Sequence, residues 1–113
     1  MRSGALRHKI KVERRTRVSD GGGGFVQGWE TFEDDLKARI VNVSGKEAVV
    51  EDALSGIETH HIYVRESSRT KTITNLMRII DKRTGKIHNI KSALPDERER
   101  VIMIMTQSGG RDE

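Results

Sequence analysis

The sequence contains no cysteine and a single proline among its 113 residues. Without cysteine the chain can form neither disulfides nor thiolate metal sites, so no covalent or zinc cross-link supplements the core of so small a domain. Long apolar runs are also absent, since no stretch approaches the ~18 residues that a membrane-spanning helix needs. The N-terminal sequence MRSGALRHKIKVERR lacks the apolar segment of a secretory signal. We therefore expect neither a membrane span nor an export signal.

Aromatic residues are scarce, because the chain has two phenylalanines, one tryptophan and one tyrosine. With 34% apolar residues in all, the core must be thin and mostly aliphatic. Charged residues make up another 34%, which is above the ~25% usual for a globular domain. The net charge of +4 favours contact with an anionic partner. It falls short of the dense basic stripe that dedicated nucleic-acid-binding proteins show.

β-branched residues are abundant, with 11 isoleucines, 9 valines and 8 threonines against 5 leucines. These side chains lose rotamer freedom in helices and pack well on pleated sheets. Apolar and polar residues also alternate, most clearly around Ile10 and Val12, as in a strand with one buried face. The pattern predicts strands over residues 8–18, 29–43, 57–65, 71–81, 87–94 and 100–106.

The spacing of these strands predicts the fold class. Turn signals at about ten-residue intervals indicate an all-β fold, namely a small antiparallel β-barrel or sandwich of about six strands. The segment 46–54 is predicted to form one short helix or ordered loop. We expect a single domain over residues 1–113, with a flexible loop at 19–28 and a loose tail at 107–113.

Three local departures from the alternation carry further predictions. Trp29 breaks the parity of its strand, which predicts a bulge or bend among Glu33-Asp34-Asp35. The run 76–80 is apolar on both faces at most positions, so this half of its strand is predicted to be the more buried one. Phe25, Trp29 and Phe32 lie within eight residues and are predicted to plug one end of the core, in preference to forming a base-stacking platform.

Histidines are the only side chains of this sequence suited to binding a transition metal, and there are four, His8, His60, His61 and His88. Adjacent residues of a strand point to opposite faces, so His60 and His61 cannot readily chelate one ion. We expect four half-exposed strand histidines and no metal site. A small metal-dependent hydrolase built on these histidines is the less favoured alternative.

Catalytic patterns are missing as well. The acidic run Glu33-Asp34-Asp35 and the pair Glu97 and Glu99 are expected in turns beside basic residues, where nothing raises a carboxyl pKa for acid–base catalysis. The glycine run 21–24 lacks the spacing of a phosphate-binding loop. We predict no catalytic residues and no cofactor, and hence that the chain is not an enzyme.

The balance of charge and core suggests association with other chains. A six-stranded sheet has edge strands, and unpaired edges are a liability unless they are charged, covered or paired. The run 101–105 has no polar member, so both of its faces should be covered. Self-association is therefore expected. The alternative is a barrel that closes on itself.

Seven short motifs occur in a characteristic order along the chain. They are Leu6-Arg7-His8-Lys9-Ile10, Gly28-Trp29-Glu30, Ala38-Arg39-Ile40, Gly45-Lys46-Glu47, Thr59-His60-His61-Ile62-Tyr63-Val64-Arg65, Gly85-Lys86-Ile87-His88-Asn89-Ile90 and Asp96-Glu97-Arg98-Glu99-Arg100. In this order and spacing, over about residues 4–106, the sequence resembles the tailed-phage head–tail joining proteins, also called head closure or head–tail adaptor proteins.

The resemblance implies a small β-barrel that forms a homo-oligomeric ring. Such a ring closes the DNA-filled capsid and provides the surface on which the tail docks, without enzymatic activity. The implied partners are the portal or adaptor protein above, a tail-completion or tail protein below, and packaged DNA in passing contact, with no membrane. The implied location is the neck of the virion, after assembly in the host cytoplasm.

Two segments are candidate sites within that role. The candidate channel or plug loop is acidic against a basic chain, and a surface that does not grip phosphates lets DNA slide; its residues are Gly45, Lys46, Glu47, Glu51, Asp52 and Gly56. An ordinary surface loop is the equal alternative for this segment. The candidate partner-contact loop comprises Asp20, Gly21, Gly22, Gly23, Gly24, Phe25 and Trp29. Flexible segments of this kind, and the tail 107–113, become ordered on docking.

An alternative function remains open. A small basic nucleic-acid-binding β-barrel, OB- or Tudor-like, would use Lys11, Arg14, Arg15 and Arg17 for phosphates, with Trp29 or Tyr63 stacking on a base. Its binding to nucleic acid would weaken steeply with salt, since counterions are released from the phosphates.

Overall fold

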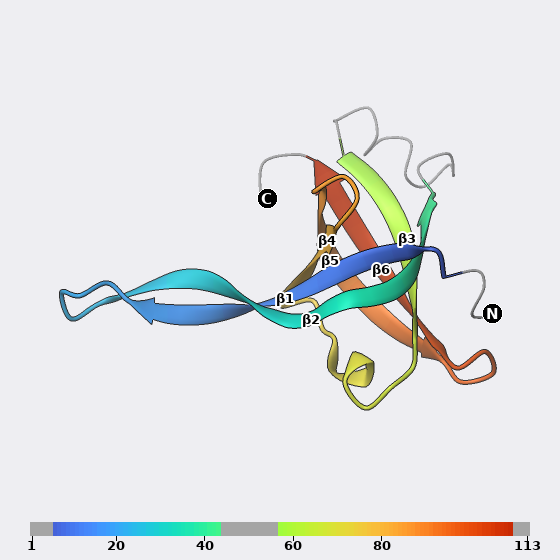
Figure 1. The fold of residues 1–113 in the computed structure, drawn as a ribbon, viewed down its shortest axis with the longest axis horizontal. Helices are drawn as coiled ribbons and strands as arrows, with labels where there is room; N and C mark the ends of the chain where they lie inside the picture. The colour runs from blue at the N-terminus through green and yellow to red at the C-terminus, as the bar shows by residue number, and fades with distance from the viewer. Residues whose placement is uncertain (1–5, 44–56, 110–113) are drawn as a thin grey trace.

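The computed structural model describes residues 6–43 and 57–109, which form one antiparallel sheet with almost no helix (Figure 1). The elements in chain order are β1 (His8–Ser19), β2 (Phe25–Asn42), β3 (Ile57–Arg65), the 3-10 helix η2 (Thr70–Thr72), β4 (Met77–Asp81), β5 (Ile87–Asp96) and β6 (Val101–Gly109). The all-β prediction of about six antiparallel strands is confirmed. Within the described residues, no helix has the length and apolarity needed to cross a bilayer.

The sheet closes on itself in the order β1-β2-β3-β6-β5-β4. β1 completes the circuit because it pairs with β2 on one side, as in His8 with Ala38, and with β4 on the other, as in Ile10 with Asp81. The closed sheet makes the fold a barrel and not a sandwich. Because the barrel strands have neighbours on both sides, the expectation of unpaired barrel edges is wrong, and the reason for association must lie elsewhere.

The interior of the barrel is aliphatic, as the scarcity of aromatic residues predicted. Fully buried apolar side chains come from five of the six strands, and the largest of them are Ile10, Ile62, Ile79 and Ile104. Strand β6 places Ile102 and Ile104 in this core, while Met103 and Met105 on its other face are only half-buried. The apolar run of β6 is therefore covered fully on one face and partly on the other.

The chain between β3 and β4 differs from the predicted strand 71–81. Residues 70–72 form η2, and β4 begins only at Met77. Leu76 is consequently 68% exposed, so the prediction that residues 76–80 form a buried half-strand is wrong at its first position. The threonine hydroxyl groups of this segment hydrogen-bond to nearby backbone groups. These bonds stabilise a turn in place of pairing with a neighbouring strand.

Strands β1 and β2 continue past the barrel as a two-stranded arm (Figure 1). β4 pairs with β1 no further than Arg14, and β3 pairs with β2 only from Ala38 onward. Residues 15–29 of the hairpin, which we call the arm, therefore pair with each other alone. The predicted loop 19–28 is shorter than expected, since Ser19 pairs with Phe25.

The end of the arm is a tight turn formed by the glycine run. The Asp20 carboxylate accepts hydrogen bonds from the backbone N–H groups of Gly22 (2.8 Å) and Gly24 (3.1 Å). Gly21 and Gly23 have φ values of 82° and 90°, a region that residues with a side chain rarely adopt. The glycines therefore serve a hairpin turn.

A bulge separates the barrel part of β2 from the arm, which confirms the predicted irregularity among Glu33-Asp34-Asp35. Ile10 pairs with Leu36 but Val12 with Glu33, so β2 contains one extra residue between them. Asp35 has a φ of 51°. Bulges bend a strand and increase its twist, which turns the hairpin away from the barrel.

Two other expectations concern the chain ends and the loop. Residues 107–109 belong to β6 and pair with β3, as in Gln107 with Thr59, so the prediction of a loose tail is wrong for these three residues, and residues 110–113 lie outside the described part of the chain. The predicted helix or ordered loop at 46–54 lies outside the described residues.

We predict that the buried core contributes far more to the free energy of unfolding than the exposed side chain of Leu76, which precedes β4. Ile104→Ala should lower the free energy of unfolding by about 2–5 kcal/mol, because it leaves a cavity in a closed barrel. Leu76→Ala should change it by less than about 0.5 kcal/mol, since that side chain is exposed. Urea unfolding followed by circular dichroism measures both, and equal losses for the two variants would contradict the observed placement of Leu76.

Candidate functional site

The arm carries arginines stacked on aromatic rings. The Arg15 guanidinium lies 5.4 Å from the centroid of the Trp29 ring, and Arg78 of β4 lies 4.0 Å from the same centroid. Nearer the turn, Arg17 lies 4.7 Å from the Phe25 ring centroid. Contacts of this kind are attractive because the ring face is electron-rich.

The predicted aromatic plug in the core is therefore wrong for two of its three members. Phe32 does pack against the core cluster. Trp29 and Phe25 belong to the arm, and Phe25 is 61% exposed. The sequence showed that these rings are close in the chain, but not that the hairpin leaves the barrel between them.

The outer half of the arm is both basic and apolar. At its root, Glu13 pairs with Arg78 (2.8 Å) and with Lys11 (3.5 Å). Among the residues that the structure describes, no carboxylate pairs with Arg15 or Arg17. Val26, next to Phe25, is 52% exposed. Exposed apolar side chains beside unneutralised guanidinium groups are typical of a surface that contacts another molecule.

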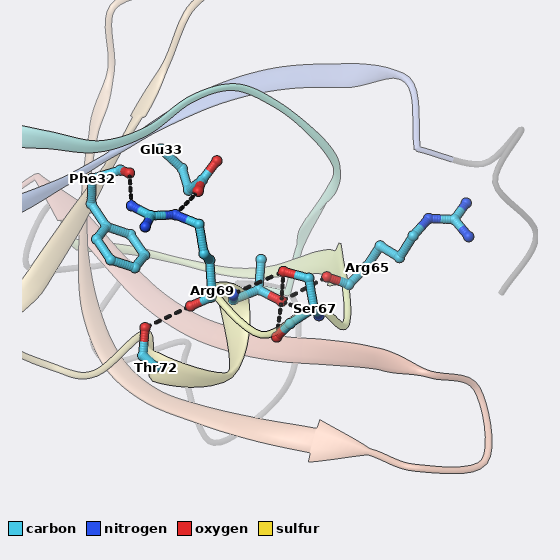
Figure 2. Close-up of polar contacts among 7 residues, drawn as sticks. Phe32, Glu33, Arg65, Ser67, Arg69 and Thr72 are labelled. Atoms are coloured by element: carbon cyan, nitrogen blue, oxygen red, sulfur yellow. Dashed lines mark hydrogen bonds and ion pairs between the residues drawn. The ribbon is translucent and has the colours of Figure 1, made fainter.

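Arg69, from the chain between β3 and β4, fixes the root of the arm (Figure 2). Its Nη2 donates a hydrogen bond to the Phe32 carbonyl oxygen (2.7 Å), and its Nε pairs with the Glu33 carboxylate. The guanidinium also lies 4.4 Å from the Phe32 ring centroid. One side chain thus holds the backbone, the carboxylate and the ring at the point where β2 bends.

Hydroxyl contacts hold Arg69 itself in place (Figure 2). The buried Thr70 hydroxyl donates to the Arg65 carbonyl oxygen (2.8 Å) and accepts from the Ser67 N–H (2.7 Å). The Thr72 hydroxyl donates to the Arg69 carbonyl oxygen (2.6 Å). These hydrogen bonds hold the chain between β3 and β4 in one conformation and so fix the direction of the Arg69 guanidinium.

Lys82 fixes the other side of the bulge. Its Nζ lies 2.7 Å from an Asp34 oxygen and 2.6 Å from an Asp35 oxygen. The hydrogen bond from Lys82 lowers the pKa of Asp34, and the bonds to Asp34 and Asp35 raise the pKa of Lys82. The acidic run has the basic neighbours that were predicted, but it lies in a strand bulge and not in a turn.

Two histidines are buried, which contradicts the expectation of four half-exposed ones. His60 and His88 face one another inside one end of the barrel, with ring centroids 4.9 Å apart and planes at 88°. Their exposed fractions are 8% and 1%. Among the described residues, neither ring nitrogen of His88 has a hydrogen-bond partner, nor has Nδ1 of His60. His60 belongs to β3 and His88 to β5. These two strands both pair with β6, one on each side of it, and their histidine side chains meet inside the barrel.

Burial governs the titration of this histidine pair. Desolvation lowers the pKa of His88 to about 4, with further lowering by His60 and Lys86. Desolvation also lowers the pKa of His60. Across residues 6–43 and 57–109, no group of three histidine or acidic side chains is arranged to hold a metal ion. The pair is therefore a neutral, buried feature of the barrel at neutral pH.

The structure places the two candidate segments differently. The candidate plug-loop residues, Gly45, Lys46, Glu47, Glu51, Asp52 and Gly56, lie outside the described residues. Asp20, Gly21, Gly22, Gly23, Gly24 and Phe25 form the end of the arm, and Trp29 lies at its root. Sequence reasoning missed Arg69 and Lys82, because nothing in the local pattern signals a cation from a distant turn.

A closed barrel with a fixed, projecting, basic and apolar arm defines a protein that acts through contacts with other molecules. The chain belongs to the phage head completion protein family, whose pattern it matches over residues 1–109. It is therefore a phage head-related structural protein. The resemblance drawn from the ordered motifs is confirmed, and the family supports a non-enzymatic role.

Solved structures share the fold. The solution structure of protein SF1141 from Shigella flexneri 2a matches with a TM-score of 0.73 and 28% sequence identity, over 99% of this chain and 100% of that chain. A chain in the virion of a native gene transfer agent particle matches with a TM-score of 0.61 and 16% identity, over 93% of this chain and 96% of that chain. The comparison with curated proteins found no match.

We predict that the buried histidines make the protein less stable in mild acid. The pKa of His88 is about 4 when folded, against an ordinary 6.5, so the unfolded chain takes up a proton first as the pH falls. Stability is full above pH ~6.5 and declines toward pH ~4, where His88 alone accounts for a loss of about 3 kcal/mol. Urea midpoints measured from pH 8 to pH 4 give this slope.

His88→Leu should flatten that slope, because it removes the titrating group and two unpartnered nitrogens. His61→Leu, on the opposite face of β3, is the matched control and should keep the slope. Carboxylate protonation begins below about pH 5, so the slopes are compared between pH 6.5 and pH 5. An unchanged slope in the His88 variant would refute the assignment.

We predict that Arg69 stabilises the direction of the arm more than the barrel. Arg69→Ala should cost about 1 kcal/mol of global stability, because the pair with Glu33 is partly exposed. It should accelerate hydrogen exchange of the amides in residues 29–36 while leaving β3 and β6 protected. Arg65→Ala is the control, since that side chain points away from the network (Figure 2). Equal exchange in both variants would show that Arg69 has no such role.

Proposed function

We propose that the protein forms a homo-oligomeric ring at the neck of the virion, where it closes the DNA-filled capsid and provides the surface on which the tail docks. The observation that carries this proposal is the match of nearly the whole chain, residues 1–109, to the phage head completion family. The partners in this proposal are the portal or adaptor protein on one side, a tail-completion or tail protein on the other, and DNA in passing contact.

The surface of the chain supports this role. A closed barrel offers no strand edge for pairing, so contacts between copies must use side chains and the projecting arm. The arm provides exposed Phe25 and Val26 together with Arg15 and Arg17. A ring requires that one flank of each copy meets a different flank of the next, and an arm that extends from one side of a barrel suits such a contact (Figure 1).

The channel or plug role of residues 45–56 stays a prediction. Its basis is the acidic composition of the segment within a basic chain, which would keep it from gripping the phosphates of DNA. A structural observation supports the partner-contact role of the arm end, because Phe25 is exposed and lies at the tip of a projecting hairpin.

One observation bears on the alternative of a nucleic-acid-binding barrel. Arg15 and Arg17 lie on the arm beside Trp29 and Phe25, as a phosphate- and base-binding surface would require. The guanidinium groups already cover these rings, however, and Tyr63 is covered likewise by Arg39 at 6.0 Å. Base stacking would have to displace them. We therefore favour a protein partner for the arm.

The test is completion of heads in vitro. Purified protein added to DNA-filled, portal-bearing heads that lack it should increase DNA retention and allow tails to attach, as counted by electron microscopy and by infectious particles. Imaging of the completed particles should show a ring of this protein at the neck. Heads that retain DNA and accept tails equally well without the protein would contradict the proposal.

The same purified protein can be used to distinguish the neck role from the alternative function, a nucleic-acid-binding barrel. Filter binding to duplex DNA should be weak in the proposed structural role. A nucleic-acid-binding module would instead show strong binding that falls steeply as salt rises. That result, together with heads that gain nothing from the protein, would favour the alternative.

A further inference from the structure

A pocket opens at the end of the barrel between the η2 connection and the β5–β6 hairpin. Its volume is about 320 Å³, and its lining includes three apolar side chains, Ile73, Ala93 and Ile102, and one cation, Lys71. Two carboxylates, of Glu66 and Glu97, belong to its wall. A cavity of roughly 150 Å³ lined by aliphatic side chains is enough to bind benzene, so this pocket has room for a phenyl ring.

The charge of the pocket is only partly neutralised. Glu66 pairs with Lys71 at 3.3 Å. Glu97, in the turn between β5 and β6, has no ion-pair partner among the residues described. A pocket that combines apolar side chains with the unpaired carboxylate of Glu97 favours an occupant that has both a ring and a positive charge.

The end of the arm has this combination. Phe25 is 61% exposed and Arg17 lies over its ring at 4.7 Å. Like Glu97, Arg17 has no ion-pair partner in the described part of the chain. The ring supplies the apolar area, and the guanidinium supplies the counter-charge that the pocket lacks.

We propose that the arm of one copy docks into the pocket of a second copy, with Phe25 against the apolar side chains and Arg17 paired with Glu97. The inference rests on the proposed ring and names the contact that builds it. The arm and the β5–β6 hairpin lie on opposite sides of the barrel (Figure 1). An arm that points away from its own pocket fills that of a neighbour, which gives the head-to-tail contact that a ring needs.

DNA and a tail protein are the other conceivable occupants of these surfaces. DNA suits the arm but not the pocket, because phosphates are repelled by Glu66 and Glu97. A tail protein could use either surface, but nothing requires it to match both. Two complementary surfaces on one chain are explained most simply by the chain itself, and the test below separates the three cases.

The absence of cysteine allows a clean cross-linking test with the full chain. Val26→Cys marks the arm, and Lys71→Cys, which lines the pocket and replaces a side chain that is 59% exposed, marks the pocket. The two variants, one of them labelled with ¹⁵N, are mixed and treated with a short bismaleimide. Intact mass then separates heterodimers from both homodimers. We expect heterodimers well above their statistical share of about one half.

Leu76→Cys replaces the pocket marker in the control, since Leu76 is 68% exposed and lies outside the pocket. Its mixture with Val26→Cys should give the statistical share only. A Val26–Lys71 heterodimer yield no greater than this control would overturn the proposal.

Charge reversal tests the named ion pair. Introducing Arg17→Glu into the arm-marked chain should lower the heterodimer yield about tenfold, the effect of losing about 1.4 kcal/mol. Adding Glu97→Arg to the pocket-marked chain should restore it. Loss without restoration would show that these two side chains do not meet.

The outcomes also separate this contact from the proposed function. Failed cross-linking together with successful completion of heads would reject the arm–pocket contact and keep the neck role. Failure of both would reject both. Cross-linking of the arm to added duplex DNA or to tail protein, unaffected by Glu97→Arg, would assign the arm to that partner and also overturn the proposal.

Discussion

Strand β2 has to serve two structures at once, and the bulge within it makes this possible. From Ala38 onward it is a wall of the barrel paired with β3, whereas before Glu33 it is half of a free hairpin. A regular strand would continue the curvature of the barrel. The extra residue changes the direction of the strand, and the positive φ of Asp35 fixes the change locally.

The bulge depends in turn on cations supplied from elsewhere. Glu33 pairs with Arg69, and Asp34 and Asp35 pair with Lys82. Without these cations, three adjacent carboxylates would repel one another in the same short segment. Each pair is at least partly exposed and weak by itself. Together they position the arm relative to the barrel, so surface charge here determines geometry more than stability.

The sequence predicted what depends on local pattern. Alternation located β3 at both ends, and the break at Trp29 located the bulge. It could not predict that β1 and β2 leave the barrel, because Thr16, between Arg15 and Arg17, continues the alternation of the core residues Ile10 and Val12. What distinguishes the arm is the lack of a third strand, and pairing between distant strands leaves no trace in the periodicity of one strand.

The same reasoning explains the errors about the site. His60 and His88 have polar side chains, so composition assigned them to the surface, yet β3 and β5 turn both into the barrel. Arg69 lies in a serine- and threonine-rich turn whose sequence indicates only a loop. Its role depends on Thr70 closing that loop and on Phe32 lying opposite. Contacts across 37 residues are properties of the fold.

Closure of the barrel changes what assembly can rely on. An open sheet can recruit another copy through backbone hydrogen bonds, which are strong in number but indifferent to sequence. The closed part of the sheet has no such edge, and only the arm, whose two strands lack a third partner, keeps unpaired ones. Recognition by the barrel itself therefore falls to side chains, which discriminate between partners. A thin aliphatic core then suffices, because it needs only to hold the barrel closed. Only Phe32 of the four aromatic residues packs against the core cluster, and all four rings lie beside arginine guanidinium groups. This chain thus places its few aromatic rings beside surface charge and leaves the core to isoleucine and valine.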